Sequence, residues 1–200
     1  MGKPKLPLEL SSGVALGSMA LRALLTSGIG RIHIVVRPDD PLAWLRDIRR
    51  DSLYDSQLNI VVCEEASLGM SYSIRAGVDA ALSSLPVPDA IVIGLGDQPF
   101  VTAAMVRRLL VVMEENPALD FAASSMRGIV MPPAVVRHTM YKALRGLKGD
   151  TGARKLFGSP DYAGEIIEFG EEGEELLLDV DDEDSLGQAI RRYRQIRDRR

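Results

Sequence analysis

A short apolar run in the middle of the chain constrains the fold more than any other feature. Ala90–Ile93 is uninterrupted by polar residues and leads through a turn to Asp97 and then to Thr102, which is suited to cap a following helix. An apolar run without alternation is typical of a parallel strand that is covered on both faces. Acids that follow such strands lie where open α/β sheets bind ligands, so Asp97 is a candidate site residue. A simple turn role for Asp97 is the alternative.

Apolar runs and helical patterns alternate along the first half of the chain. Ile32–Val36 and residues 58–63 are expected to form strands, and helices are expected to begin near Pro41 and Gly69. Such alternation predicts an α/β fold of three layers, doubly wound, in which helices cover both faces of a mostly parallel sheet. We find no repeat and no long linker, so residues 1–200 are expected to form one domain.

The segment 67–82 contains a second candidate site at the entrance of its expected helix. Gly69, Ser71 and Ser73 are small, and residues of this kind let backbone N–H groups approach an anion or a base edge. The apolar residues at helical spacing in the same segment are assigned to packing instead.

The second half of the chain is less regular. Pro132 and Pro133 are expected in the first turn of a helix, and Asp150 is a possible N-cap for a helix that contains Arg154. Residues 176–180 are apolar apart from Asp179 and are expected to form a strand. Arg154 is suited to bind a phosphate with two hydrogen bonds, although a solvated cation on an exposed helix is almost as good an interpretation.

Acidic residues gather between this expected strand and the last helix. Acids at a helix start typically cap the helix, which is the favoured interpretation for Asp179 and the alternative to metal binding for Asp181. The basic C-terminal segment 191–200 continues the apolar face of that helix, so it is interpreted as a solvated helix end rather than as a nucleic-acid-binding tail.

Composition limits the class of protein. The chain has 200 residues, of which 46% are hydrophobic, and a formal net charge of −4, which argues against a nucleic-acid surface. Cys63 is the single cysteine and lies in an apolar run, so it is expected to be a core residue. The sequence shows no leader and no apolar run long enough to span a bilayer, so a cytoplasmic location without membrane contact is expected.

Several segments together resemble the MobA-like nucleotidyltransferases, and among them the molybdenum cofactor cytidylyltransferases of xanthine dehydrogenase maturation. These segments are MGKPKL, GMSYSIRAG, GDQPFV, LKGDTGAR and LLLDVDDEDSL, which occur in this order over nearly the whole chain. The resemblance implies a Rossmann-like nucleotidyltransferase fold. It also implies a nucleotide-binding half, residues 1–115, and an acceptor-binding half, residues 116–200.

The resemblance further implies an activity and a set of roles. A terminal phosphate of molybdopterin would attack the α-phosphate of CTP, or of another NTP, with Mg²⁺ as cofactor. Asp97 matches the family's metal-binding acid, Asp181 its second metal-facing residue, and Lys5 its triphosphate-binding lysine. The segment with Gly69, Ser71 and Ser73 would face cytosine and ribose, and the segment with Arg154 would lie beside the pterin-bearing substrate. A xanthine dehydrogenase-type apoenzyme is the protein partner that it implies.

Two departures from the family pattern leave alternatives open. Asp182, Glu183 and Asp184 stand where the family has Thr, Pro and Glu, and the family's first strand and its loop L-A-A-G-x-S-x-R precede the Met-Gly of this sequence. We therefore expect an N-terminally truncated version of the fold, whose longer natural form carries the loop. The alternatives are a guanylyl or sugar-phosphate transferase of the same fold, or a non-catalytic cofactor-delivery protein.

Overall fold

The computed structural model describes residues 4–170 and 175–199; the first residues of the MGKPKL segment and Arg200 lie outside this range. Its strands are β1 (Glu9–Ser11), β2 (Val14–Ala15), β3 (Ile32–Val36), β4 (Leu58–Val62), β5 (Ala90–Ile93), β6 (Phe121–Met126), β7 (Ile129–Arg137) and β8 (Gly164–Glu168). Its α-helices are α1 (Leu16–Leu25), α2 (Arg46–Arg49), α3 (Ser52–Asp55), α4 (Met70–Leu82), α5 (Ala103–Glu115), α6 (Tyr141–Arg145), α7 (Arg154–Phe157) and α9 (Glu183–Asp198).

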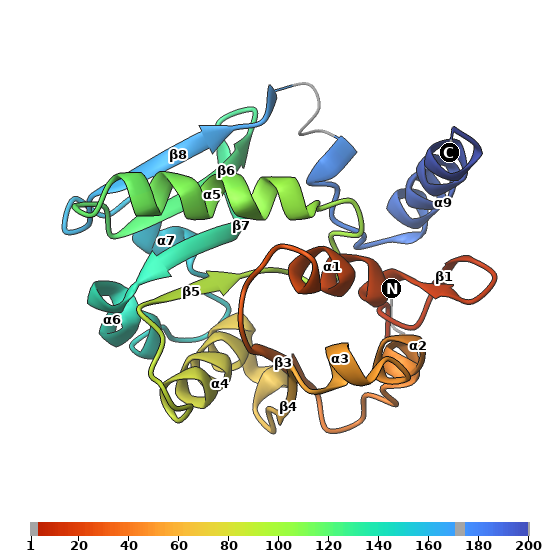
Figure 1. Cartoon of the computed structure of the whole chain (residues 1–200), viewed down its shortest axis with the longest axis horizontal. Helices are drawn as coiled ribbons and strands as arrows, with labels where there is room; N and C mark the ends of the chain where they lie inside the picture. Colours follow the sequence, from red (N-terminus) through yellow and green to blue (C-terminus); the bar gives the residue numbers. More distant parts are fainter. Residues whose placement is uncertain (1–3, 171–174, 200) are drawn as a thin grey trace.

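The larger strands form two sheets that lie apart in Figure 1. One sheet pairs β3 with β4 in parallel, and the other has the order β5-β7-β6-β8, in which β7 runs antiparallel to both neighbours and β8 runs parallel to β6. Within the described residues β3 pairs only with β4, and β5 pairs only with β7. Each of these two strands therefore keeps one unpaired edge, which agrees with the partial exposure of every residue in β5.

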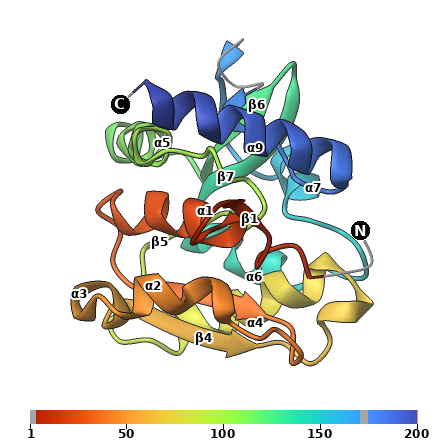
Figure 2. The same cartoon turned by 90° about the vertical axis from the view of Figure 1, so that its right-hand side faces the viewer.

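Helices cover these sheets on both sides, as the alternating sequence pattern predicts. Helix α5 packs on β6 and β7, and α4 packs on β3 and β4. The C-terminal helix α9 lies beside β1 and buries its apolar face there against Leu10 and Leu16, an arrangement that can be followed in Figure 2. Among the described residues no helix is long and apolar enough to cross a membrane.

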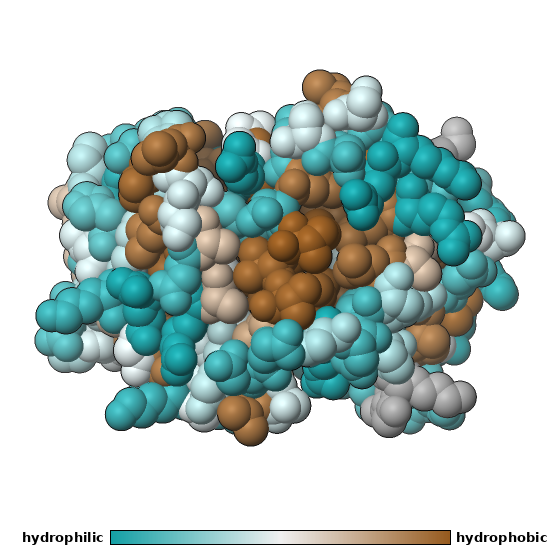
Figure 3. Space-filling model, turned by 90° about the horizontal axis from the view of Figure 1, so that it is seen from below, coloured by the Kyte–Doolittle hydropathy of each residue, from teal (hydrophilic) through white to brown (hydrophobic). Residues whose placement is uncertain are grey.

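The sheet of β3 and β4 leaves apolar surface uncovered. Figure 3 shows apolar side chains gathered at the centre of the lower face of the molecule, the side on which Figure 1 places β3 and β4. On β4, Val62 is 53% exposed, whereas Ile34 and Val36 on β3 are buried. The two strands of one sheet thus differ in how completely they are covered.

The structure corrects the prediction of a helix after Pro132 and Pro133, because both prolines lie inside β7. They lie at an irregularity where the pairing with β6 passes from Ala123↔Ala134 to Ser124↔Met131. Proline has no N–H to give to a ladder, and it is tolerated at such bulges for that reason. The carbonyl of Pro133 accepts a hydrogen bond from Ser124 Oγ at 2.9 Å.

Two further local predictions were wrong. Residues 177–180 carry no regular secondary structure, although Leu177 and Val180 are buried, so this apolar run packs without joining a sheet. Asp150 does not cap the helix that follows it, since Ala153 occupies the N-cap of α7. Thr102 does cap α5, with its hydroxyl oxygen accepting a hydrogen bond from Met105 N at 3.2 Å.

Candidate active site

Three of the predicted site residues, which are far apart in the sequence, meet in one place. Lys5 Nζ lies 2.6 Å from Asp97 Oδ2 and 2.6 Å from Asp181 Oδ1. These distances are typical of short charge-assisted hydrogen bonds. The structure thus joins Lys5, Asp97 and Asp181, together with the neighbouring Asp179, in a group that we call the acid cluster.

Backbone contacts hold the two acidic segments of the cluster together. Asp97 follows β5, and its carbonyl oxygen accepts a hydrogen bond from Val180 N at 3.1 Å. Asp181 directly precedes a capping box, in which Asp182 and Ser185 exchange hydrogen bonds at the start of α9. The acids at this helix start therefore divide into two roles: Asp182 caps the helix, and Asp181 turns toward Lys5.

Charge and burial shape the acid–base properties of the cluster. Burial alone would lower the pKa of Lys5, but hydrogen bonds to Asp181 and Asp97 outweigh it and raise the pKa above its ordinary value. Burial raises the pKa of Asp179, and the charge of Asp97 adds to this effect. Lys5 therefore stays protonated, and Asp179 resists ionisation beside two other acids.

Several buried polar atoms in and beside the cluster have no hydrogen-bond partner among the described residues. They are Asp97 Oδ1, Asp179 Oδ1 and both amide atoms of Gln98, whose residue is 0% exposed. Buried polar groups without partners cost about 1–3 kcal/mol each, so native proteins usually pair them with water, an ion or a ligand. The sequence analysis missed Gln98 and gave Asp179 to capping. Two features of the sequence could have indicated these residues: Gln98 directly follows Asp97, and Asp179 lies two residues before Asp181.

The oxygen donors of the cluster fit a magnesium ion that shares its coordination with a substrate. Carboxylate and amide oxygens are ligands that Mg²⁺ prefers. Across the described part of the chain no group of three or more His, Cys, Asp or Glu side chains forms a complete metal cage. Mg²⁺ in nucleotide enzymes is typically held by one or two carboxylates plus substrate phosphates, which agrees with this partial set.

The entrance of α4 is fastened to a loop from the second half of the chain. Ser71 Oγ donates a hydrogen bond to the Gly149 carbonyl at 2.6 Å, and Met70 N donates one to Asp150 Oδ1 at 3.2 Å. Asp150 therefore caps α4 rather than the helix next to it in sequence. Ser71 is buried, and its hydroxyl forms this contact. Ser73 lies in the first turn of α4 and is partly buried.

Gly69 has the conformation and the surroundings that require glycine. Its φ is 131°, a region that residues with a side chain rarely adopt. A Cβ at this position would lie 2.6 Å from the carbonyl carbon and oxygen of Gly149. We call these contacts of Gly69 and Ser71 with Gly149, and of Met70 with Asp150, the seam between the two halves.

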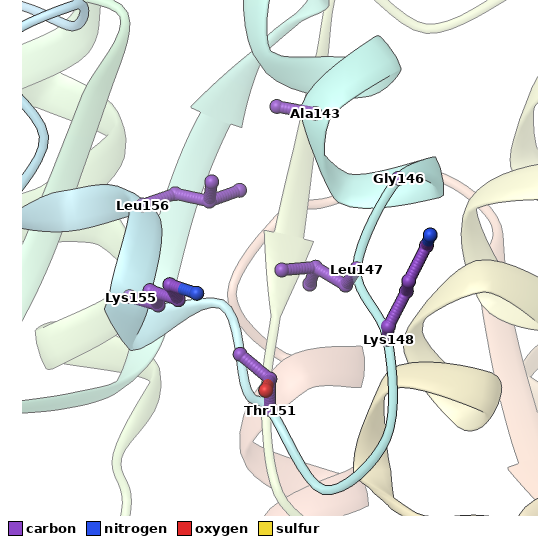
Figure 4. A pocket seen from close by; sticks show the side chains of 7 residues that line it. All are labelled: Ala143, Gly146, Leu147, Lys148, Thr151, Lys155 and Leu156. Atoms are coloured by element: carbon purple, nitrogen blue, oxygen red, sulfur yellow. The ribbon is translucent and has the colours of Figure 1, made fainter.

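The loop beyond the seam borders a cavity of about 400 Å³ between α6 and α7 (Figure 4). Figure 4 shows the side chains of Lys148, Lys155 and Thr151 around this space, with Leu147 and Leu156 as apolar walls. Both lysines are exposed and form no ion pair with another described residue. We call this cavity the basic pocket. Arg154 begins α7 next to Lys155, is exposed, and does not line the pocket.

Comparison with known protein families gives a match over most of the chain. Residues 1–164 match the MobA-like NTP transferase domain. This chain belongs to the MobA-like NTP transferase family. One relative, the purine catabolism protein PucB of Bacillus subtilis (strain 168), is 33% identical over 183 residues, which cover 90% of this chain and 85% of PucB. The resemblance drawn from the sequence segments is confirmed, and the protein is assigned to the nucleotidyltransferases.

Solved structures show the same fold for the MobA-like chain. Rv0371c of Mycobacterium tuberculosis H37Rv, in complex with manganese, has a TM-score of 0.72 at 23% identity and covers 95% of this chain and 93% of its own. Molybdopterin-guanine dinucleotide biosynthesis protein A of Archaeoglobus fulgidus has a TM-score of 0.63 at 15% identity, with 96% and 92% covered. These likenesses confirm the predicted Rossmann-like nucleotidyltransferase fold.

Proposed function

We propose that this protein is a Mg²⁺-dependent cytidylyltransferase that joins CMP from CTP to a molybdopterin-type cofactor. The observation that carries the proposal is the acid cluster: Lys5, Asp97 and Asp181 converge beyond the end of β5, within an established nucleotidyltransferase family. Open α/β sheets bind their ligands beyond the carboxyl ends of their strands. The cluster thus lies where the donor nucleotide is expected.

The relatives support the finer parts of this proposal. PucB is named for purine catabolism, which suits the maturation of a xanthine dehydrogenase-type apoenzyme, since xanthine is a purine. The Archaeoglobus protein is named for molybdopterin-guanine dinucleotide biosynthesis, which suits a molybdopterin-type acceptor. The manganese in Rv0371c supports a divalent cation.

The proposed reaction is a substitution at phosphorus. A phosphate oxygen of the acceptor forms a bond to the α-phosphorus of CTP, and the bond from this phosphorus to the oxygen that bridges to the β-phosphate breaks. The bond electrons leave with pyrophosphate. When bound, Mg²⁺ would neutralise phosphate charge, which is its usual contribution to such transfers.

The chain's own residues position the reactants. Asp97 and Asp181 would hold the cation through carboxylate oxygens. The ammonium group of Lys5, kept protonated by its raised pKa, would meet triphosphate oxygens. Gly69, Ser73 and the backbone at the entrance of α4 would border the base and ribose, with Ser71 fixing the loop that carries Gly149.

The basic pocket is proposed to receive the body of the acceptor, in the half at residues 116–200. A volume of about 400 Å³ lies within the range of small-molecule sites, and the apolar walls suit a flat organic ring system. Lys148 and Lys155 favour an anionic acceptor because neither lysine is neutralised by an acid of the described chain. Arg154, beside the pocket, remains the candidate for a further phosphate contact.

The proposal is tested by incubating the protein with α-phosphate-labelled CTP, Mg²⁺ and molybdopterin cofactor. We expect label in a cofactor–CMP product and release of one pyrophosphate per product. Transfer from GTP but not from CTP would assign the chain to guanylyl transfer. Labelled sugar phosphates as acceptors test for a sugar-phosphate nucleotidyltransferase. An absence of transfer from every nucleotide would favour the cofactor-delivery alternative.

A further inference from the structure

The ammonium group of Lys5 occupies the position between two carboxylates that come from distant parts of the chain. Its distances to Asp97 Oδ2 and to Asp181 Oδ1 are both 2.6 Å. A divalent cation held by the same two oxygens would need the space that this ammonium group fills. Two cations cannot share this space, so the lysine and the metal ion exclude each other.

We propose that Lys5 is an internal counter-ion that holds Asp97 and Asp181 together in the metal-free protein and leaves them when a divalent cation binds. This inference rests on the proposed function, because that function places the cation at these acids. Lys5 is then a positioning residue with two alternative partners. It contacts the carboxylates in the metal-free protein and the triphosphate after the metal ion has bound. Metal binding and nucleotide binding become linked through one side chain.

The geometry allows this movement. The side chain of Lys5 is 30% exposed, so it has a solvent-accessible side on which to move. Lysine carries a compact charge on a flexible stem, and its donors rotate to suit different partners. The backbone of the second segment stays fixed meanwhile, because Val180 N is bonded to the Asp97 carbonyl and Asp182 caps α9.

Lys5 contacts only some of the carboxylate oxygens of the cluster, so a divalent cation in its place could bind more of them. Asp97 Oδ1 and Asp179 Oδ1 are buried and have no hydrogen-bond partner in the described part of the chain while Lys5 is in place. The single ammonium charge of Lys5 lies among carboxyl groups that influence one another electrostatically. A divalent cation supplies twice that charge and accepts additional oxygen ligands, so it can displace the lysine.

Linkage gives the measurable consequence. Any ligand that binds the Lys5 ammonium group away from the two carboxylates increases the affinity of the carboxylates for metal. A triphosphate is such a ligand, because its oxygens bind the ammonium group. Nucleotide therefore tightens metal binding in the wild type by removing a competitor. Without the ammonium group at residue 5, the metal ion binds more tightly from the start, and this part of the nucleotide effect is absent.

The test is a Mn²⁺ titration of the whole chain, followed by the electron paramagnetic resonance signal of free Mn²⁺, without nucleotide and with CTP. Lys5→Met should bind Mn²⁺ about tenfold more tightly than the wild type when nucleotide is absent. Lys5→Arg keeps the competing charge and should stay near the wild type, and Lys142→Met, an exposed lysine on α6, serves as the matched control. The gain in Mn²⁺ affinity on adding CTP should be smaller in Lys5→Met.

Asp97→Asn separates this inference from the proposed function. If Asp97→Asn loses Mn²⁺ binding while Lys5→Met binds as the wild type does, or more weakly, competition is refuted and the metal site of the proposed function stands. If Asp97→Asn binds Mn²⁺ unchanged, the cation is held elsewhere, and both the proposed site and the inference are overturned. Circular dichroism of each variant shows that the comparison is made between folded proteins.

Discussion

The acid cluster and the basic pocket handle charge in opposite ways. In the acid cluster, Lys5 is bound to Asp97 and Asp181, and the group still retains buried oxygens without partners. In the basic pocket, Lys148 and Lys155 have no acidic partner among the described residues. Among the described residues, the lysine of the first region is thus paired with acids, whereas the two lysines of the second region are not. A cation would complete the first region, and an anionic acceptor would complete the second.

The largest effect is expected at the acid cluster. Asp97→Asn should lower the transfer rate about 100- to 1,000-fold, because one carboxylate that would stabilise phosphate charge is lost at a preorganised site. The fold should persist, since the side chain of Asp97 is partly exposed rather than packed in the core. Rates of pyrophosphate release measure the loss. Asp184→Asn, on the exposed start of α9, is the control and should keep the wild-type rate.

A change at the seam should lower the stability of the fold. Gly69→Ala places a Cβ 2.6 Å from the Gly149 carbonyl and forces a left-handed φ of 131° on alanine. Strain and overpacking should destabilise the protein by roughly 2–4 kcal/mol. Denaturant unfolding measures this loss. Gly30→Ala has open space at its Cβ position and should be nearly neutral; equal stability of the two variants would show that the seam is not a tight contact.

A smaller effect, confined to the acceptor, is expected at the basic pocket. The double change Lys148→Ala with Lys155→Ala should raise KM for the molybdopterin-type acceptor about tenfold, which corresponds to roughly 1.4 kcal/mol of lost charge-assisted binding. The affinity for CTP should stay the same. Lys142→Ala, outside the pocket, is the matched control. A tenfold loss of CTP affinity in the double variant would contradict the division of roles between the two regions.

The smallest effect concerns Asp179 in the metal-free protein. Its raised pKa means that its ionised form opposes folding once pH exceeds the ordinary carboxyl value. Asp179→Asn should therefore raise Tm at pH 7, by about 2 °C after allowance for solvent screening, and the gain should vanish as pH falls below about 4. Differential scanning calorimetry checks the sign. A lower Tm at pH 7 would show that ionised Asp179 stabilises the cluster.

Secondary structure could be predicted from the sequence wherever local preferences agree with the tertiary packing. The apolar run Ala90–Ile93 forms β5, Thr102 caps α5, and the small residues after Gly69 open α4, because each of these features is decided by neighbours in the chain. Pro132 and Pro133 misled the prediction, since a bulge in β7 removes the need for their missing N–H groups. Such a bulge depends on the pairing with β6, which lies outside any local pattern.

The charged residues of the site could be predicted where they belong to recognisable sequence motifs. Asp97 was found from its place after an apolar strand, Lys5 and Asp181 were found through the resemblance, and the structure brings all three together. Gln98 was missed because its importance comes from complete burial beside Asp179, a property that only tertiary packing creates. The role of Asp150 was misassigned for a similar reason, since its carboxylate caps α4, which precedes it by many residues.

Calorimetric titration of CTP and GTP, with and without Mg²⁺, into the wild type and Asp97→Asn tests the central claim most directly. The acid cluster as a cation-dependent nucleotide site predicts that CTP binds more tightly than GTP, that binding requires Mg²⁺, and that Asp97→Asn loses this requirement together with most of the affinity. Binding of CTP that is equally strong without Mg²⁺ and unchanged in Asp97→Asn would contradict the account.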